Sequence, residues 1–179
     1  MKTVLLFFVL NLPLFSQFGI SFENSGINNN QIIISSIEVN DYEISSNKNF
    51  ATNYGYGLDI SGISIFYYFT SGDDEIKIVK TTDELFSILN ISVYQVSEIS
   101  LDTLIFTGWK NSEIEYQSKF IDIKNWKTLE LNFYDIDSLI ISLGDFGVET
   151  ISDFNFDNIV FDKYGGDYKP SVIKLKYLE

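Results

Sequence analysis

The segment from Leu101 to Ile123 reads LDTLIFTGWKNSEIEYQSKFIDI, and its pattern decides the fold class. Two runs rich in β-branched and aromatic residues lie on either side of the turn signal Lys110-Asn111-Ser112. The second run largely alternates apolar and polar residues, as expected when one face of a strand is buried, and the first is rich in β-branched residues. The segment therefore predicts two neighbouring strands joined by a tight turn.

The same pattern continues from this segment toward both ends of the chain. Turn signals recur every ~8–12 residues, which is typical of a β-sandwich or barrel; one of them is Ser45-Ser46-Asn47. Further strands are expected at Gln31–Val39, Ile63–Thr70, Ile88–Val96, Leu129–Tyr134, Ser138–Leu143 and Phe154–Phe161, with shorter ones at Phe18–Glu23, Glu75–Lys80 and Val172–Tyr177. We therefore expect an all-β chain.

The composition excludes several classes of chemistry. The 179 residues are 45% hydrophobic, so the chain can bury one core and is not of the disordered type. It contains no His and no Cys, and all 12 basic residues are Lys. A Ser-His-Asp triad, a cysteine nucleophile, a His or Cys zinc site and a disulfide framework are therefore excluded. The net charge of −13 disfavours nucleic acid as a partner.

The N-terminal residues have the pattern of a secretory signal peptide. Lys2 precedes an apolar run, Val4–Leu10, which is followed by Pro13 and by the small residue Ser16. The run is shorter than the ~20 residues that a membrane-spanning helix needs, and no second run of that length follows. The expected organisation is a signal peptide at 1–16, a β-sandwich domain at 17–162 and a C-terminal tail at 163–179 with room for one short strand. This predicts a secreted, extracellular protein without a transmembrane segment in its mature form; the alternative is a buried N-terminal strand.

One N-glycosylation sequon is present at Asn90-Ile91-Ser92. It matters only in a eukaryotic host. Because it falls within an expected strand, the run Ile88–Val96, it competes with the burial of that strand.

Several stretches together resemble a known family. They are the Gly/Tyr loop Phe50–Leu58, the strand from Leu101 to Trp109, the strand Ile114–Ile123, the run Trp126–Phe133, the run Ile136–Leu139 and the closing segment Phe156-Asp157-Asn158-Ile159-Val160-Phe161. They resemble the secreted jelly-roll, galactose-binding-like domains of exported microbial surface proteins, with folds of the carbohydrate-binding-module type. The resemblance spans about residues 18 to 162 and implies a jelly-roll-like antiparallel β-sandwich that binds without catalysis.

The resemblance also implies a structural calcium ion that ties the first strand to the last. In such modules the final strand carries an Asp that helps to hold calcium, and an acidic residue of the first strand joins it. Glu23, Asn24, Asp157 and Asn158 supply the oxygen atoms that calcium prefers. The competing interpretation is that Asp157-Asn158 is a bulge whose side chains are hydrogen-bonded locally.

Aromatic residues near turns are the candidates for ligand binding. β-Sandwiches bind sugars with an aromatic face against the C–H face of the ring, and with polar groups on its hydroxyls. Tyr54 and Tyr56 lie in the Gly-flanked loop, Trp109 ends a strand and Trp126 precedes one. Each of these four can equally serve as packing, because most large aromatic side chains are substantially buried.

Three functions follow from these observations. The favoured one is a secreted, non-catalytic module that binds a glycan or another component of the cell surface or matrix, with neutral ligands preferred because the chain is acidic. The second is a structural protein of a matrix or surface layer that self-associates through its edge strands. The third is a glycoside hydrolase that uses acids alone, for which Glu113 with Glu115, or Asp135 with Asp137, alternate on one strand face.

Overall fold

The computed structural model describes residues 16–20, 33–39, 41–54, 63–69, 73–95, 103–144, 152–163 and 173–176. Their regular structure is entirely β. The strands are β1 (Ser16–Ile20), β2 (Ile33–Val39), β3 (Tyr42–Tyr54), β4 (Ile63–Phe69), β5 (Glu75–Lys80), β6 (Phe86–Gln95), β7 (Thr103–Lys110), β8 (Glu113–Ile121), β9 (Lys127–Ile136), β10 (Ser138–Leu143), β11 (Ser152–Lys163) and β12 (Ile173–Lys176). Within these residues there is no helix that could cross a membrane.

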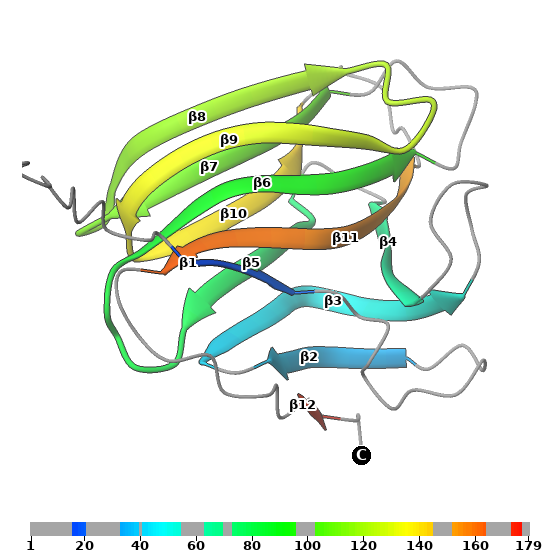
Figure 1. Cartoon of the computed structure of the whole chain (residues 1–179). Coiled ribbons are helices and arrows are strands. Elements are labelled where there is room, and N and C mark those ends of the chain that lie inside the picture. The colour runs from blue at the N-terminus through cyan, green and yellow to red at the C-terminus, as the bar shows by residue number, and fades with distance from the viewer. Residues whose placement is uncertain are drawn as a thin grey trace, which may run out of the picture.

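The strands form two antiparallel sheets that pack face to face. The first, called the β7 sheet here, has the order β8-β7-β10-β5-β3, with β2 and β12 beyond β3. The second, the β6 sheet, has the order β4-β11-β6-β9, with β1 on the far half of β11. Figure 1 shows β9, β6 and β11 in front of β7, β10 and β5. The antiparallel β-sandwich expected from the sequence is confirmed.

Strand β3 connects the two sheets. Its first part, Tyr42–Ser46, pairs with β5 in the β7 sheet, and its last part, Ala51–Tyr54, pairs with β4 in the β6 sheet. The turn expected at Ser45-Ser46-Asn47 is therefore wrong, because these residues lie inside a strand. The cause is tertiary: the strand passes from one sheet to the other here, and the polar side chain of Asn47 has partners in neighbouring segments.

The core is made by the alternate residues of each strand that point between the sheets. Leu139 and Ile141 of β10 are buried, as are Phe154 and Phe156 of β11 in the opposite sheet. Near the margin of the sandwich, the ring of Tyr116 on β8 stacks on that of Phe133 on β9, with centroids 5.0 Å apart. These contacts hold the sheets together in a chain without disulfides.

Candidate functional site

An open groove of about 560 Å³ lies on the outer face of the β7 sheet. It is lined by Glu75 and Lys77 of β5, Ser138, Ile140 and Ser142 of β10, Thr107 and Trp109 of β7, Asp137, Ser112 and Ile114. This volume falls within the ~300–1,000 Å³ that is usual for small-molecule sites. The groove is lined from four neighbouring strands and the turn between two of them.

The groove exists because short side chains lie between long ones. Leu139, Ile141 and Leu143 of β10 are buried in the core, so the alternate residues of this strand point outward. The serines among them, Ser138 and Ser142, are small. Ser138 is opposite Val79 and Trp109, and Ser142 is opposite Glu75 and Ile105, so each serine has longer side chains on both sides and leaves a hollow on β10.

Trp109 lies at one end of this hollow. In the sheet it is opposite Ser138 of β10 on one side and Ile114 of β8 on the other. Its side chain is partly exposed. Next to it on the same face of β7 is Thr107, whose hydroxyl accepts a hydrogen bond of 3.5 Å from the Gln117 side-chain amide. The groove thus combines an aromatic surface with hydroxyl groups.

The carboxylate of Asp137 holds the turn beside Trp109. Its Oδ2 accepts a hydrogen bond of 2.7 Å from the backbone N–H of Asn111, and its Oδ1 accepts one of 2.9 Å from the Ser138 hydroxyl. The backbone N–H of Asp137 donates to the carbonyl of Trp109 at 2.9 Å. Asn111 and Ser112 both have positive φ values, 52° and 66°, as a two-residue hairpin turn requires. This end of the groove is therefore fixed by polar contacts.

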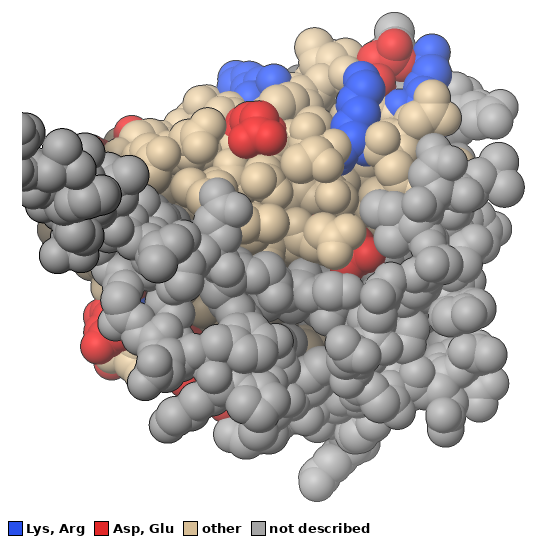
Figure 2. All heavy atoms as spheres, viewed as in Figure 1, with Lys and Arg blue, Asp and Glu red and all other residues tan. Residues whose placement is uncertain are grey.

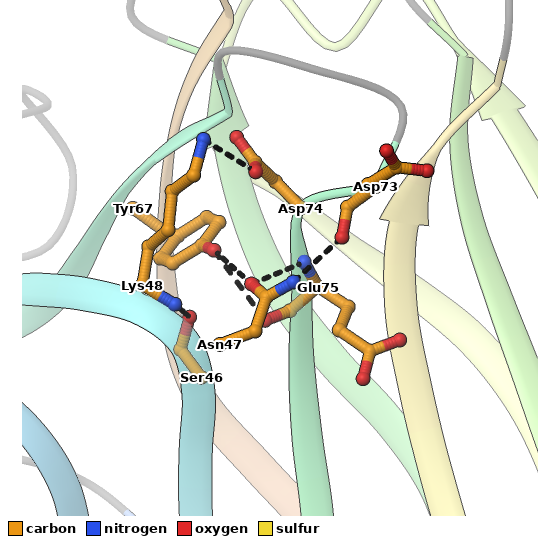
Figure 3. Close-up of polar contacts among 7 residues, drawn as sticks. All are labelled: Ser46, Asn47, Lys48, Tyr67, Asp73, Asp74 and Glu75. Atoms are coloured by element: carbon orange, nitrogen blue, oxygen red, sulfur yellow. Dashed lines mark hydrogen bonds and ion pairs between the residues drawn. The ribbon is translucent and has the colours of Figure 1, made fainter.

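A second polar cluster fixes the other side of the groove, where β5 begins (Figure 3). The Asn47 side-chain carbonyl accepts hydrogen bonds from the backbone N–H of Glu75 at 3.1 Å and from the Tyr67 hydroxyl at 3.2 Å. Lys48 forms an ion pair of 2.6 Å with Asp74, whose side chain is buried. Burial raises the pKa of the Tyr67 hydroxyl, which therefore stays protonated as a donor. Glu75 is thus held by contacts to β3.

The charges of the groove are few and nearly balanced. Glu75 and Asp137 contribute two negative charges and Lys77 one positive charge, so the lining has a formal charge of −1. Glu75 is opposite Ser142, whereas Asp137 precedes Ser138. The backbone positions of these two residues are therefore about 13 Å or more apart along β10, since a strand rises ~3.3 Å per residue.

The two tryptophans expected to bind a ligand lie apart. Trp126 stacks on Tyr94 of β6, with ring centroids 5.8 Å apart and planes at 27°, and it is partly exposed. Trp126 follows the C-terminal end of β8, where Ile121 is opposite Thr103. Trp109 lies at the other end of the β7–β8 hairpin, next to its turn. The hairpin is about 20 Å long. Figure 2, from the side of the β6 sheet, shows a mostly uncharged surface over the described residues.

The tyrosines of the Gly/Tyr loop are not part of the described groove. Tyr54 is the last residue of β3 and is opposite Ile63 of β4; its side chain lies outside the described part of the molecule. Tyr56 lies outside it entirely. Their binding of a ligand stays a prediction.

The expected calcium ligands can be placed only in part. Asp157 and Asn158 lie in β11 at a register shift, and the backbone N–H of Asn158 donates to Asp157 Oδ1 at 2.7 Å. This is the local hydrogen bond of the competing interpretation. The first strand does reach this region, because β1 pairs with β11 up to Ile20 opposite Ile159. Glu23 and Asn24 lie outside the described residues, among which no group of three or more acidic side chains could hold a metal. Calcium therefore stays a prediction.

The sequon lies in the middle of a strand. Asn90 of β6 is opposite Val160 of β11 and Glu130 of β9, and its side chain is partly buried. Ser92 is buried, and its hydroxyl is 3.4 Å from that of Thr128. Both neighbouring strands thus flank the acceptor site.

The sequence predicts Trp109 as a candidate for ligand binding, but it does not predict the polar residues that line the groove with it. Thr107 precedes Trp109 by two positions, and the segment Ser138-Leu139-Ile140-Ile141-Ser142 carries hydroxyls at alternate positions. This alternation is the signal that could have identified them. Their meeting with Glu75 and Lys77 depends on the pairing of β10 with β5, which joins segments about 60 residues apart.

Comparisons with known proteins give a similarity of structure only. No protein-family model matches the chain, and no curated protein matches it significantly. The solved structures that are similar include the following three. The first is TmCBM61 in complex with β-1,4-galactotriose, with 7% identity, a TM-score of 0.41, and 69% of this chain and 90% of that chain covered. The second is the cleaved adhesin domain of Lys-gingipain from Porphyromonas gingivalis, with 10% identity, a TM-score of 0.42, and coverages of 84% and 99%.

The third similar structure is a CBM4 module, with 12% identity, a TM-score of 0.32, and coverages of 82% of this chain and 85% of that one. Two of the three have names of carbohydrate-binding modules, CBM61 and CBM4. Similarities of this size transfer neither a ligand nor a site to this chain.

Proposed function

We propose that this chain is a non-catalytic module that binds a neutral glycan in the groove beside Trp109. The observation that carries the proposal is the placement of a partly exposed tryptophan at the end of a hollow whose other lining groups include the hydroxyls of Thr107, Ser112, Ser138 and Ser142. An aromatic face packs on the C–H face of a sugar ring, and hydroxyl groups bond to those of the sugar.

The charge of the groove favours a neutral ligand. The lining has a formal charge of −1, and the whole chain has a net charge of −13. An acidic polysaccharide would be repelled by both. Glu75 and Lys77 on the β5 side can each bond to sugar hydroxyls without demanding a charged partner.

The geometry of the carboxylates supports binding over hydrolysis. Glycosidases place their two carboxyl groups about 5–9.5 Å apart, so that both reach the same glycosidic bond. The backbone positions of Glu75 and Asp137 are about 13 Å or more apart along the strand. Both oxygens of Asp137 are also engaged in hydrogen bonds to Asn111 and Ser138. The hydrolase alternative uses Glu113 with Glu115, or Asp135 with Asp137. Of these four residues only Asp137 lines the groove, and the engagement of its carboxylate supports binding over hydrolysis there.

Export and calcium are separate parts of the proposal. The signal-peptide pattern of residues 1–16 supports a secreted, extracellular protein. The adjacency of β1 and β11 supports a calcium ion between Glu23 and Asp157, since the last residue of β1, Ile20, is opposite Ile159, two residues after Asp157 in the middle of β11. Neither part is needed for binding in the groove.

The binding test compares the two tryptophans. The chain is first applied to an array of neutral and acidic glycans, and the best ligand is then titrated by calorimetry. Trp109→Ala should weaken binding at least about tenfold, because truncating an aromatic anchor of a binding site often costs about 2 kcal/mol or more. Trp109→Phe, which keeps an aromatic ring, should lose less.

Trp126→Ala serves as the matched control, because Trp126 is a partly exposed tryptophan outside the groove. The Trp126→Ala variant should bind the glycan with the same affinity as the unmodified chain. Equal affinity for Trp109→Ala and the unmodified chain would contradict the proposal. A preference for acidic glycans on the array would contradict its neutral-ligand part.

A further inference from the structure

Strand β8 ends the β7 sheet with an exposed edge. It pairs with β7 along one side, and no strand among the described residues pairs with its other side. Figure 1 shows β8 along the upper margin of the molecule. Glu115, Gln117, Lys119 and Ile121 alternate along it as exposed residues. An open edge of this kind has unpaired backbone donors and acceptors.

The two large apolar side chains most exposed on the described surface lie at the two ends of this strand. Ile114 is 54% exposed and Ile121 is 57% exposed. Antiparallel pairing of two identical strands brings the start of one beside the end of the other. If Gln117 of the two copies were opposite each other, Ile121 of one copy would be opposite Glu113 of the second copy, one residue from its Ile114, at both ends of the contact.

The neighbouring edge strand β9 lacks these properties. Asn132 and Asp135 in β9 have φ values of 53° and 54°, so its extended backbone is interrupted twice. Such irregularities protect an edge from pairing. No residue from Glu113 to Ile121 in β8 has a positive φ, and its one irregularity is the bulge at Glu115, so the edge of β8 is interrupted once near its start and that of β9 twice.

The charges of β8 are complementary to those of β8 in a second copy of the chain that is related by a two-fold axis. With Gln117 opposite the same residue of a second copy, Glu115 of each copy faces Lys119 of the other. Opposite charges at facing positions of antiparallel strands stabilise the pair, and like charges destabilise it. We propose that two copies of this chain pair through the β8 edges, in the register that places Gln117 opposite Gln117.

This dimer would present two grooves on one surface. A two-fold axis perpendicular to the plane of the joined sheet keeps the outer faces of both β7 sheets on the same side. The groove of each copy includes Ser112 and Ile114 at the start of β8. Two adjacent grooves would bind a polymer with more than one contact, which raises the apparent affinity. This consequence rests on the proposed function, whereas the dimer itself does not.

The test measures the mass of the full chain by size-exclusion chromatography with light scattering, without glycan. At ~0.15 M salt the general repulsion between the acidic chains is screened beyond ~8 Å. The mass should rise toward that of a dimer with concentration. Glu115→Lys and Lys119→Glu should each raise the dissociation constant at least about tenfold, because two facing pairs become repulsive.

Mixing the two variants separates this register from other modes of association. In a mixed dimer the two substituted positions face each other with opposite charges, and the unchanged Lys119 of one copy faces the unchanged Glu115 of the other. The mixture should therefore dimerise where each variant alone does not. Glu130→Lys on β9 and Lys124→Glu, which is 61% exposed outside β8, carry the same charge changes and should dimerise normally.

Two results would overturn the inference. One is a monomer at every concentration reached by the unmodified chain. The other is a dimer that neither single variant weakens, which would assign the contact to another surface. Glycan titration of the same samples is independent: loss of binding in Trp109→Ala with an unchanged dimer would support both proposals, and a dimer without any glycan binding would remove the proposed function alone.

Discussion

Asp137 Oδ2 accepts a hydrogen bond of 2.7 Å from the backbone N–H of Asn111, so the junction of β9 and β10 holds the tip of the β7–β8 hairpin. The same carboxylate accepts the hydroxyl of Ser138 at 2.9 Å. Trp109 takes part in the same junction, since its backbone carbonyl accepts a hydrogen bond from the backbone N–H of Asp137. The position of the Trp109 side chain in the groove thus depends on Asp137, whose carboxylate contacts the turn.

Replacing Asp137 by Asn should loosen this end of the groove. A hydrogen bond to a charged acceptor contributes about 1.5–3 kcal/mol when buried, and less at a partly exposed site such as this one. We expect a loss of about 1 kcal/mol in the free energy of unfolding, measured in urea, and a weaker glycan affinity. Asp135→Asn, an exposed neighbour with the same charge change, should leave both unchanged. Equal values for the two variants would contradict a positioning role of Asp137.

Adding a methyl group at Gly108 should destabilise the sandwich. A Cβ at this position would lie 3.0 Å from the Phe133 ring and 3.1 Å from Ile136, both of which are buried. Overpacking of this kind typically costs about 1–3 kcal/mol. Thermal unfolding of Gly108→Ala should show a lowered melting temperature. Gly144→Ala, at the end of β10 with its nearest contact at 3.2 Å, should show a smaller change.

Stability should fall at high pH because of Tyr42. Burial, together with Asp41 and Glu84, raises the pKa of Tyr42 to about 12. The pKa of the same group in the unfolded chain is about 10. A raised pKa in the folded state gives a stability contribution that is fully present below pH ~10 and is lost as the pH rises through ~12. Urea unfolding of the unmodified chain should therefore show a falling free energy of unfolding between these values.

Tyr42→Phe is the control for this pH dependence. The ring stacks on Phe161 with centroids 4.0 Å apart, and phenylalanine keeps this contact. The variant should lose less stability between pH ~10 and ~12 than the unmodified chain. Identical pH profiles would assign the effect to other tyrosines, including Tyr67.

Calcium should raise the melting temperature if Glu23 and Asp157 hold it together. A ligand at about 100 times its dissociation constant adds about 2.7 kcal/mol to the stability of the folded state. Melting in calcium is compared with melting in chelator, and magnesium serves as the control cation. Equal melting temperatures in calcium and chelator would leave Asp157 with its local bond to Asn158 and no role in metal binding.

The sequence by itself determined the class of fold and one residue of the site. The strand-forming runs on both sides of Asn111 and Ser112 are a local property of the sequence, because β-branched and aromatic residues favour strands and a two-residue turn joins neighbouring strands. The absence of His and Cys likewise needed no structure. Trp109 was identifiable as an aromatic residue next to a turn.

Only the tertiary structure decided which segments meet. The pairing of β10 with both β5 and β7 places Ser138 and Ser142 between Glu75 and Trp109, and this hollow is the groove. Because β3 passes from one sheet to the other, Asn47 lies in a strand and not in the turn that the sequence predicts. The groove and the path of β3 both depend on contacts between residues far apart in the chain. The free energy of these contacts comes from burying the faces of the two sheets against each other. A local sequence pattern contains no information on which distant strand pairs with it.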